Sequence, residues 1–382
     1  PLAPGESLKL SPLIVYAGTS LSAMLSEHAA RMAKEHRPRI EGEIKTGWCS
    51  WYHYYSTESQ EDIFRNAEDL SVSPLKPALD VILLDDGWNL PDNDHPCVWG
   101  DWEAGGKFPQ GMRAVAEKIH DTGFEAGLWL APFAVARDSR LFREHPDWVV
   151  GAGEGLVNNN ASVFGLDVTN PAASQFLRDT FRKVFDEWGY DYIKIDFLLY
   201  AIAPGRRYDA SVTTAQALRR GVEIIRECAG DKFILGCGTP LLQLIGLCDG
   251  MRIGPDVGSQ WSFPLNHPAW PLGNCSIKPC ARYAVYRHWQ HRVFWQNDPD
   301  CIVVRDHENG IEGNQFRKFF PHMDVRNENF GLTDREAAMW VKVIWFTGGM
   351  WFLSEDWEHL GEDRKQLVEM CVNPNPHPVR MT

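Results

Sequence analysis

A lysine and an aspartate stand two residues apart on a short apolar stretch near the middle of the chain. Residues 190–197 read Y-D-Y-I-K-I-D-F, and such aromatic and β-branched residues are typical of a buried parallel strand. On a strand, Lys194 and Asp196 point to the same side. Buried charges are costly unless they are paired or take part in chemistry, so this pair indicates a functional site.

Further polar and aromatic residues follow other apolar runs. These predicted strand ends carry Trp48, Cys49, Asp85, Asp86, Trp129, Cys237, Arg252, Asp256, Asp298 and Asp300. If the strands form a parallel barrel, all of these ends meet at one mouth. Carboxylates and cations bind sugar hydroxyls, and an indole ring packs on the apolar face of a sugar. The set therefore predicts a carbohydrate site.

The apolar runs from residue 46 onward predict strands that alternate with helices. We expect strands at 47–51, 81–85, 125–131, 190–197, 233–237, 251–253, 301–304 and 350–353. Helical patterns lie at 60–70, 111–122, 173–188, 214–229, 279–294 and 334–346. This alternation predicts an α/β fold of the (β/α)₈ TIM barrel type. A doubly wound open sheet is the alternative, but no G-x-G-x-x-G turn follows the first strand.

The chain is expected to divide into three parts. Residues 1–45 hold a lead-in strand, a helix at 21–36 and a linker, residues 46–360 form the barrel, and residues 361–382 form a C-terminal tail. The longest insertion, residues 136–171, is rich in glycine and asparagine. We expect it to form a loop at the rim of the barrel.

Charge and composition limit the partners of the protein. The chain has 382 residues, 44% of them hydrophobic, and a net charge of −13. It can therefore bury a large core, and it lacks the basic surface that nucleic acids or anionic membranes require. We expect no nucleic-acid and no membrane partner.

The cysteines and histidines show no pattern of a disulfide framework or a metal site. The nine cysteines include no C-x-x-C pair, and the scattered histidines include no H-E-x-x-H. We expect reduced thiols, no metal and no cofactor, with a cytoplasmic location. Secretion stays open because the sequence begins with proline and a removed signal would leave no trace.

Two aspartates are suited to the hydrolysis of a glycosidic bond with retention. That reaction needs one carboxylate as nucleophile and a second as acid and base. We expect Asp196 as the nucleophile, because the cation of Lys194 on the same face favours an ionised carboxylate. We expect Asp256 as the acid/base, because the turn G-P-D-V-G places it on a flexible segment after Arg252. From spacing alone, a structural Lys194–Asp196 pair and a simple turn at Asp256 remain open.

Seven motifs carry a family resemblance. They are G-W-C-S-W-Y, L-L-D-D-G-W, G-L-W-L-A-P-F, Y-I-K-I-D-F, I-L-G-C-G-T-P-L, D-G-M-R-I-G-P-D and W-Q-N-D-P-D-C. In this order they resemble the successive strand ends of glycoside hydrolase family 36, the microbial α-galactosidases.

The resemblance implies a retaining exo-α-galactosidase with a carbohydrate substrate. Asp196 matches the family nucleophile and Asp256 the acid/base, and Asp85 and Asp86 match the residues that hold the 4- and 6-hydroxyls. The resemblance also implies that the subsite is lined by Lys194, Cys237 and Arg252, with Trp129 as an aromatic wall. An α-N-acetylgalactosaminidase, a galactosyl transferase and a non-catalytic sugar-binding barrel are the alternatives. Formation of a homo-oligomer stays open.

Some features depart from the family or have a second interpretation. Family members usually carry a β-sandwich before the barrel and a small β-domain after it, and we expect only a remnant strand and no complete accessory β-domain here. Trp48 is assigned to the substrate site, with a core position as the alternative. Cys237 is equally compatible with a packed thiol, and we expect Asp298 and Asp300 to cap a loop.

Overall fold

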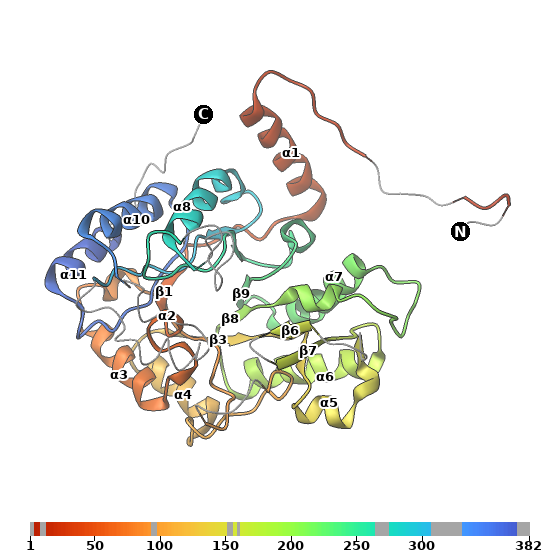
Figure 1. Cartoon of the computed structure of the whole chain (residues 1–382), viewed down its shortest axis with the longest axis horizontal. Coiled ribbons are helices and arrows are strands. Elements are labelled where there is room, and N and C mark those ends of the chain that lie inside the picture. The colour runs from red at the N-terminus through yellow and green to blue at the C-terminus, as the bar shows by residue number, and fades with distance from the viewer. Residues whose placement is uncertain are drawn as a thin grey trace.

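Eight parallel strands form the centre of the molecule (Figure 1). The computed structural model describes residues 4–7, 13–92, 98–150, 156–158, 161–263, 275–306 and 331–372. The strands are β1 (Thr46–Cys49), β2 (Val81–Leu84), β3 (Glu125–Leu130), β8 (Tyr192–Ile195), β9 (Phe233–Gly236), β10 (Gly250–Arg252), β11 (Gln296–Asp298) and β12 (Trp351–Leu353). Their order in space is β11-β10-β9-β8-β3-β2-β1-β12.

Backbone hydrogen bonds bring the two ends of this sheet together. The N–H of Met350 donates to the carbonyl of Asn297 at 2.8 Å, and the N–H of Ile302 donates to the carbonyl of Phe352 at 2.7 Å. The sheet is thus a nearly closed barrel, and the predicted (β/α)₈ TIM barrel is confirmed.

Helices cover the outside of the barrel. They are α2 (Trp51–Tyr54), α3 (Gln60–Ser71), α4 (Gly111–Asp121), α6 (Pro171–Arg182), α7 (Thr214–Ala229), α8 (Ile277–Tyr286), α10 (Asp334–Thr347) and α11 (Glu362–Glu369), and a π-helical segment, η4 (Lys183–Glu187), continues α6. Ser59, Thr213 and Thr333 begin α3, α7 and α10 with capping boxes. Each such cap stabilises its helix by about 1 kcal/mol. None of the described helices is long and apolar enough to span a lipid bilayer.

The insertion after β3 is a small folded unit rather than the expected rim loop. It contains β4 (Ala134–Ala136), α5 (Arg140–Glu144), β5 (Val149–Val150), β6 (Leu156–Asn158) and β7 (Ala161–Leu166), and β4, β5 and β6 all pair antiparallel with β7. Val135, Leu141, Val149, Phe164 and Leu166 of this unit form an apolar cluster with Ala173 of α6. These apolar residues are spread over a glycine-rich and asparagine-rich sequence, so their pairing was not visible as a periodic pattern.

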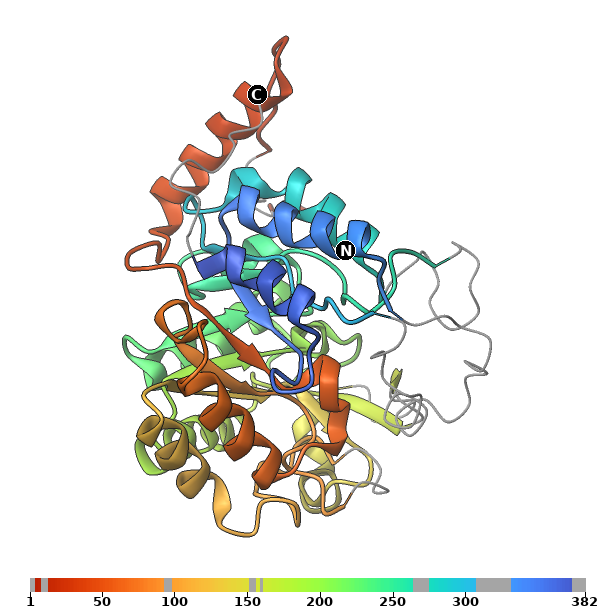
Figure 2. The same ribbon diagram turned by 90° about the vertical axis from the view of Figure 1, so that its left-hand side faces the viewer.

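The two flanking parts also differ from expectation. The helix predicted at 21–36 is confirmed as α1 (Leu21–His36), which projects from the barrel in both views (Figures 1 and 2). Residues 13–16 form no strand, and residues 1–3 and 8–12 of the expected lead-in strand lie outside the described residues. The expected C-terminal tail instead begins with α11, where Val368 is fully buried.

The seventh strand was predicted in the wrong place. It is β11 (Gln296–Asp298) rather than the apolar run at 301–304, in which Ile302 makes a single bridge to Leu353. Polar residues can occupy this buried strand because their side chains are hydrogen-bonded. The Gln296 side chain, for example, accepts from the N–H of Lys45 and donates to the carbonyl of Glu43, both at 2.8 Å.

A buried ion pair fixes the segment that follows β11. The side chains of Arg305 and Glu355 are each 3% exposed, and Arg305 Nε donates to Glu355 Oε2 at 2.7 Å. Arg305 also donates to the carbonyls of Tyr52 and Ser354, at 2.7 and 2.8 Å. The pair therefore joins this segment to α2 and to the end of β12.

The substitution Glu355→Ala should lower the free energy of unfolding by about 3–5 kcal/mol, because it leaves the Arg305 guanidinium buried without its counter-charge. Urea denaturation at neutral pH measures this. Glu117→Ala is the control, since it breaks the exposed Arg113–Glu117 pair and should cost less than about 1 kcal/mol. Equal losses in the two variants would contradict the prediction.

Candidate active site

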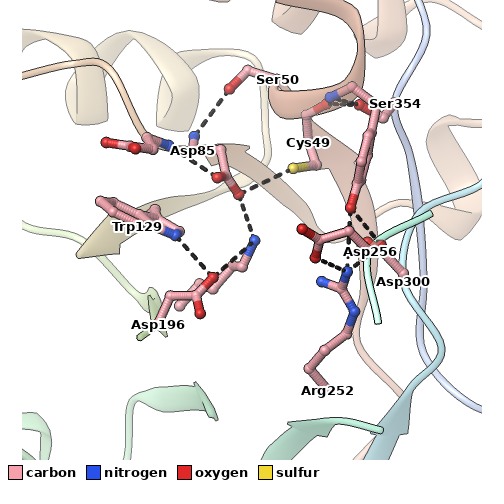
Figure 3. Close-up of polar contacts among 12 residues, drawn as sticks. Cys49, Ser50, Asp85, Trp129, Asp196, Arg252, Asp256, Asp300 and Ser354 are labelled. Carbon is pink, nitrogen blue, oxygen red and sulfur yellow. Dashed lines mark hydrogen bonds and ion pairs between the residues drawn. The ribbon is translucent and has the colours of Figure 1, made fainter. Parts of the chain in front are cut away.

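The carboxyl ends of the barrel strands bring the predicted site residues other than Trp48 to one mouth. Figure 3 shows them in two groups, one around Asp85 and Asp196 and the other around Arg252, Asp256 and Asp300. β2, β3 and β8 position the first group. β10 and the segments after β10 and β11 position the second.

Lys194 lies between two carboxylates. Its Nζ is 2.8 Å from Asp85 Oδ2 and 3.9 Å from Asp196 Oδ2, so Asp85 is the closer partner. The Cys49 thiol donates to the same oxygen of Asp85 at 3.4 Å. Burial alone would lower the pKa of Lys194, but the charges of Asp85 and Asp196 raise it well above its usual value. Lys194 is thus a buried cation held mainly by Asp85.

The carboxylate of Asp196 is fixed by two donors. The N–H of Phe197 donates to Oδ1 at 2.6 Å, and Trp129 Nε1 donates to Oδ2 at 3.3 Å. Phe197 has a φ of +49°, in the left-handed region that few non-glycine residues adopt. Gly238, from the next strand end, also has a positive φ of +59°, and a Cβ there would lie 2.8 Å from Asp196 Oδ1. Only glycine fits beside this carboxylate.

Asp86 is buried next to Asp85 and contacts an aromatic cluster. Trp99 Nε1 donates to Asp86 Oδ1 at 3.2 Å. Burial, together with the charges of Asp85 and Asp196, raises the pKa of Asp86 to about 7, although the Trp99 hydrogen bond opposes the shift. Asp86 therefore changes its protonation near neutral pH.

Trp99 and Phe197 were not assigned to the site from the sequence, although both rings lie at this mouth. The ring centroid of Trp99 lies 4.8 Å from that of Phe197 and 5.9 Å from that of Trp129. The available signal was the pair of tryptophans in V-W-G-D-W, soon after L-L-D-D-G-W. Trp99 adds an aromatic wall beside Asp86.

Arg252 is the centre of the second group. Its Nη2 donates to Asp256 Oδ1 at 2.8 Å, to Tyr52 Oη at 3.2 Å and to Asp300 Oδ2. The Asp256 side chain is 59% exposed, whereas that of Arg252 is buried. Asp256 is therefore open to solvent while it remains bound to a buried cation.

Cys237 lies near both of the proposed catalytic aspartates. Burial, together with the charge of Asp196, raises the pKa of the Cys237 thiol well above its usual value. Arg252 and Lys194 oppose this shift and Asp256 adds to it. Such a thiol stays protonated and packs as a neutral group.

Trp48 was predicted to line the substrate site, but it does not face the mouth. Alternate residues of β1 point to opposite sides, and Cys49 is the one that contacts Asp85. Trp48 is fully buried, packs edge-on against Tyr54 and donates from Nε1 to the carbonyl of Glu355 at 2.8 Å. Its indole therefore belongs to the packing between barrel and helices.

Asp298 and Asp300 differ from each other. Asp298 accepts from the N–H of Asp300 at 2.8 Å and so caps the turn after β11, as expected. Asp300 instead reaches Arg252 and Tyr52 in the second group. Among the described residues, no group of three or more His, Cys, Asp or Glu side chains is arranged to hold a metal ion.

A family model for melibiase matches residues 13–219, which is more than half of the chain. The chain belongs to the melibiase family. The matched region includes Asp85, Asp86, Lys194 and Asp196 and ends before Arg252 and Asp256. The matched residues contain the first four of the seven motifs, and the resemblance to the family 36 α-galactosidases is confirmed.

Individual relatives cover the chain to different extents. The α-galactosidase AgaA of Geobacillus stearothermophilus is 26% identical over 202 residues, 51% of this chain and 27% of that protein. The α-galactosidase of Escherichia coli is 27% identical over 181 residues, 47% of this chain and 25% of that protein. The aligned part of this chain thus spans about a quarter of the length of each of these relatives.

A solved structure covers nearly the whole chain. TtGalA, an α-galactosidase from Thermus thermophilus in complex with p-nitrophenyl α-D-galactopyranoside, has a TM-score of 0.72 and 29% identity. The similarity covers 91% of this chain and 65% of that chain. Family 36 AgaA bound to raffinose, with a TM-score of 0.63 and 16% identity, shares the fold.

Replacing Asp86→Asn should stabilise the protein more at pH 8 than at pH 5. Folding raises the pKa of the Asp86 carboxyl, so the folded state holds this proton more tightly than the unfolded state does. The folded wild-type protein therefore loses stability as the pH rises from the pKa of Asp86 in the unfolded state to its pKa in the folded state. Because asparagine removes this titration, its advantage should grow by about 2 kcal/mol between the two pH values. Urea denaturation at pH 5 and pH 8 measures it, and an equal difference at both would contradict the prediction.

Proposed function

We propose that this chain is a retaining exo-α-galactosidase that hydrolyses terminal α-galactosyl residues of oligosaccharides. The observation that carries the proposal is the pair Asp196 and Asp256 at the mouth of a melibiase-family barrel, each beside a buried cation. The likeness to TtGalA, whose complex contains an α-galactoside, supports the same substrate class.

Asp196 is the nucleophile in this proposal. Its carboxylate attacks the anomeric carbon of the sugar and forms a covalent glycosyl ester, while the bond to the leaving oxygen breaks. The donors from Phe197 and Trp129 hold the two carboxylate oxygens in place. A fixed orientation lowers the entropic cost of reaching the transition state.

Asp256 is the acid and the base. It gives its proton to the leaving oxygen in the first step, and in the second step it takes a proton from the water that attacks the anomeric carbon and releases Asp196. The exposure of Asp256 suits this role, because the leaving sugar and the incoming water both reach it from the solvent side.

The remaining residues of the mouth bind the sugar. Asp85 and Asp86 accept hydrogen bonds from sugar hydroxyls, and Lys194 and Arg252 are buried cations that donate to oxygens of the ring substituents. Trp129, Trp99 and Phe197 offer apolar ring surface beside the nucleophile. Cys237 is a small neutral neighbour of the same subsite.

Asp196→Gly should lower kcat for p-nitrophenyl α-galactoside by roughly 10⁴-fold or more, because the variant lacks the carboxylate proposed to form the covalent intermediate. Added azide should restore turnover by attacking the anomeric carbon directly, which yields the β-galactosyl azide. Product stereochemistry by NMR checks this. Near-normal activity without azide would contradict the assigned nucleophile.

Asp256→Ala should slow the release of a poor leaving group most strongly. The expected loss is about 10²- to 10⁴-fold for an alkyl or sugar leaving group and much smaller for p-nitrophenol, which needs little protonation. Steady-state kinetics with both kinds of substrate measure the ratio. Asp191→Asn is the matched control, because Asp191 lies just before β8, at the opposite end of the strand that leads to Asp196.

The 2-substituent of the sugar distinguishes the proposed activity from its nearest alternative. The p-nitrophenyl α-galactoside should be hydrolysed with a higher kcat/KM than its N-acetylgalactosamine counterpart. Faster hydrolysis of the N-acetylgalactosamine compound would identify an α-N-acetylgalactosaminidase. Failure to hydrolyse either would count against both activities.

A further inference from the structure

Asp300 is a buried carboxylate that binds three donors with one oxygen. Its side chain is 3% exposed. Oδ2 accepts from Tyr52 Oη at 2.5 Å, from the backbone N–H of Val257 at 2.7 Å and from Arg252 Nη2. Val257 directly follows Asp256, so Asp300 holds the turn that carries the acid/base residue.

The backbone of Asp300 is held in an unusual conformation. Its φ is +87°, in the left-handed region that favours glycine, and its N–H donates to Asp298 Oδ1 at 2.8 Å. Such conformations persist where the surrounding structure enforces them, and they often occur at functional sites. Here the conformation directs the carboxylate of Asp300 toward Arg252.

Arg252 connects the two aspartates through the same nitrogen, Nη2. A lone arginine next to Asp256 would favour the ionised carboxylate and would oppose the acid form required in the first step. A second carboxylate on that arginine offsets its charge. On the basis of the proposed α-galactosidase mechanism, we infer that Asp300 is a positioning residue for Asp256. It holds the turn that carries Asp256 and offsets the charge of Arg252. Asp256 can then give and take a proton in each cycle.

The charge of Asp300 offsets that of Arg252 only while its carboxyl is ionised. Burial raises the pKa of Asp300 to about 6; the charge of Arg252 opposes the rise, and the charges of Asp256 and Asp298 add to it. The other titratable groups around Asp300, Arg252 and Asp256 come from several elements: Tyr52 from α2, Tyr55 after α2, Lys194 from β8, Cys237 after β9, Cys275 before α8, Cys280 from α8 and Cys301 after β11. Of these groups only Lys194 is a cation, and it is bound to Asp85 at 2.8 Å.

The substitution Asp300→Asn tests the inference, because asparagine keeps an oxygen acceptor for Val257 and Tyr52 but removes the charge. The carboxyl carbon of Asp256, followed by ¹³C NMR in aspartate-labelled protein and assigned with Asp256→Asn, reports its titration without any turnover. The titration midpoint should fall by roughly one pH unit or more relative to the wild type. An unchanged midpoint would overturn the inference, since a purely structural role would not move it.

The kinetic counterpart is the basic limb of the kcat/KM profile for a substrate with a poor leaving group. It should move to lower pH by the same amount in Asp300→Asn, with a smaller effect on p-nitrophenyl α-galactoside. A wild-type protein that hydrolyses no α-galactoside would defeat the proposed function, and the NMR titration would still decide the role of Asp300.

Asp249→Asn is the matched control. Asp249 lies just before β10, at the opposite end of the strand that carries Arg252, and it also binds an arginine, Arg226, and a backbone N–H, that of Ile234. It should leave the Asp256 titration unchanged. If Asp300→Asn does not fold, Tyr52→Phe removes one donor to Asp300 and so raises the pKa of that carboxyl. Less negative charge then offsets Arg252, and the Asp256 midpoint should shift in the same direction by less. No shift in a folded Tyr52→Phe would then overturn the inference.

Discussion

The mouth of this barrel depends on two buried cations, each shared by two carboxylates. Lys194 lies between Asp85 and Asp196, and Arg252 lies between Asp300 and Asp256. Each cation and its two aspartates form a trio. In each trio the more deeply buried aspartate anchors the cation, and the more exposed aspartate is the one assigned to the chemistry. A buried cation would be unstable with no counter-charge, so the anchor aspartates are a condition for the site to exist.

Two of the non-glycine residues with positive φ belong to or adjoin these groups. Phe197 follows Asp196, the more exposed aspartate of the first trio, and Asp300 is the anchor of the second. In each case the backbone turns so that a carboxylate meets its donors. The strain is retained because several hydrogen bonds depend on it.

Much of the fold could be predicted from the sequence, since buried parallel strands form apolar runs and Lys194 and Asp196 interrupt one of them at a regular spacing. The position of β11 could not, because its polar side chains are hydrogen-bonded to partners far away in the chain, such as the backbone N–H of Lys45. The side of β1 on which Trp48 lies depends on strand register, which a single tryptophan does not reveal. Asp300 looked like a loop cap because its partners, Tyr52 and Val257, lie on other elements.

The closure of the barrel makes its two halves mechanically unequal. β8 lies inside the sheet, with four residues in register on each side, whereas β11 and β12 meet through bonds from Met350, Ile302 and Ser354. Amide hydrogen exchange should be slowest around β8 and faster along this seam. Asp196, the proposed nucleophile, then lies on the stiffer half, and Asp300 lies beside the seam. We expect thermal opening of the barrel to disturb the proposed proton transfer by Asp256 before it disturbs Asp196.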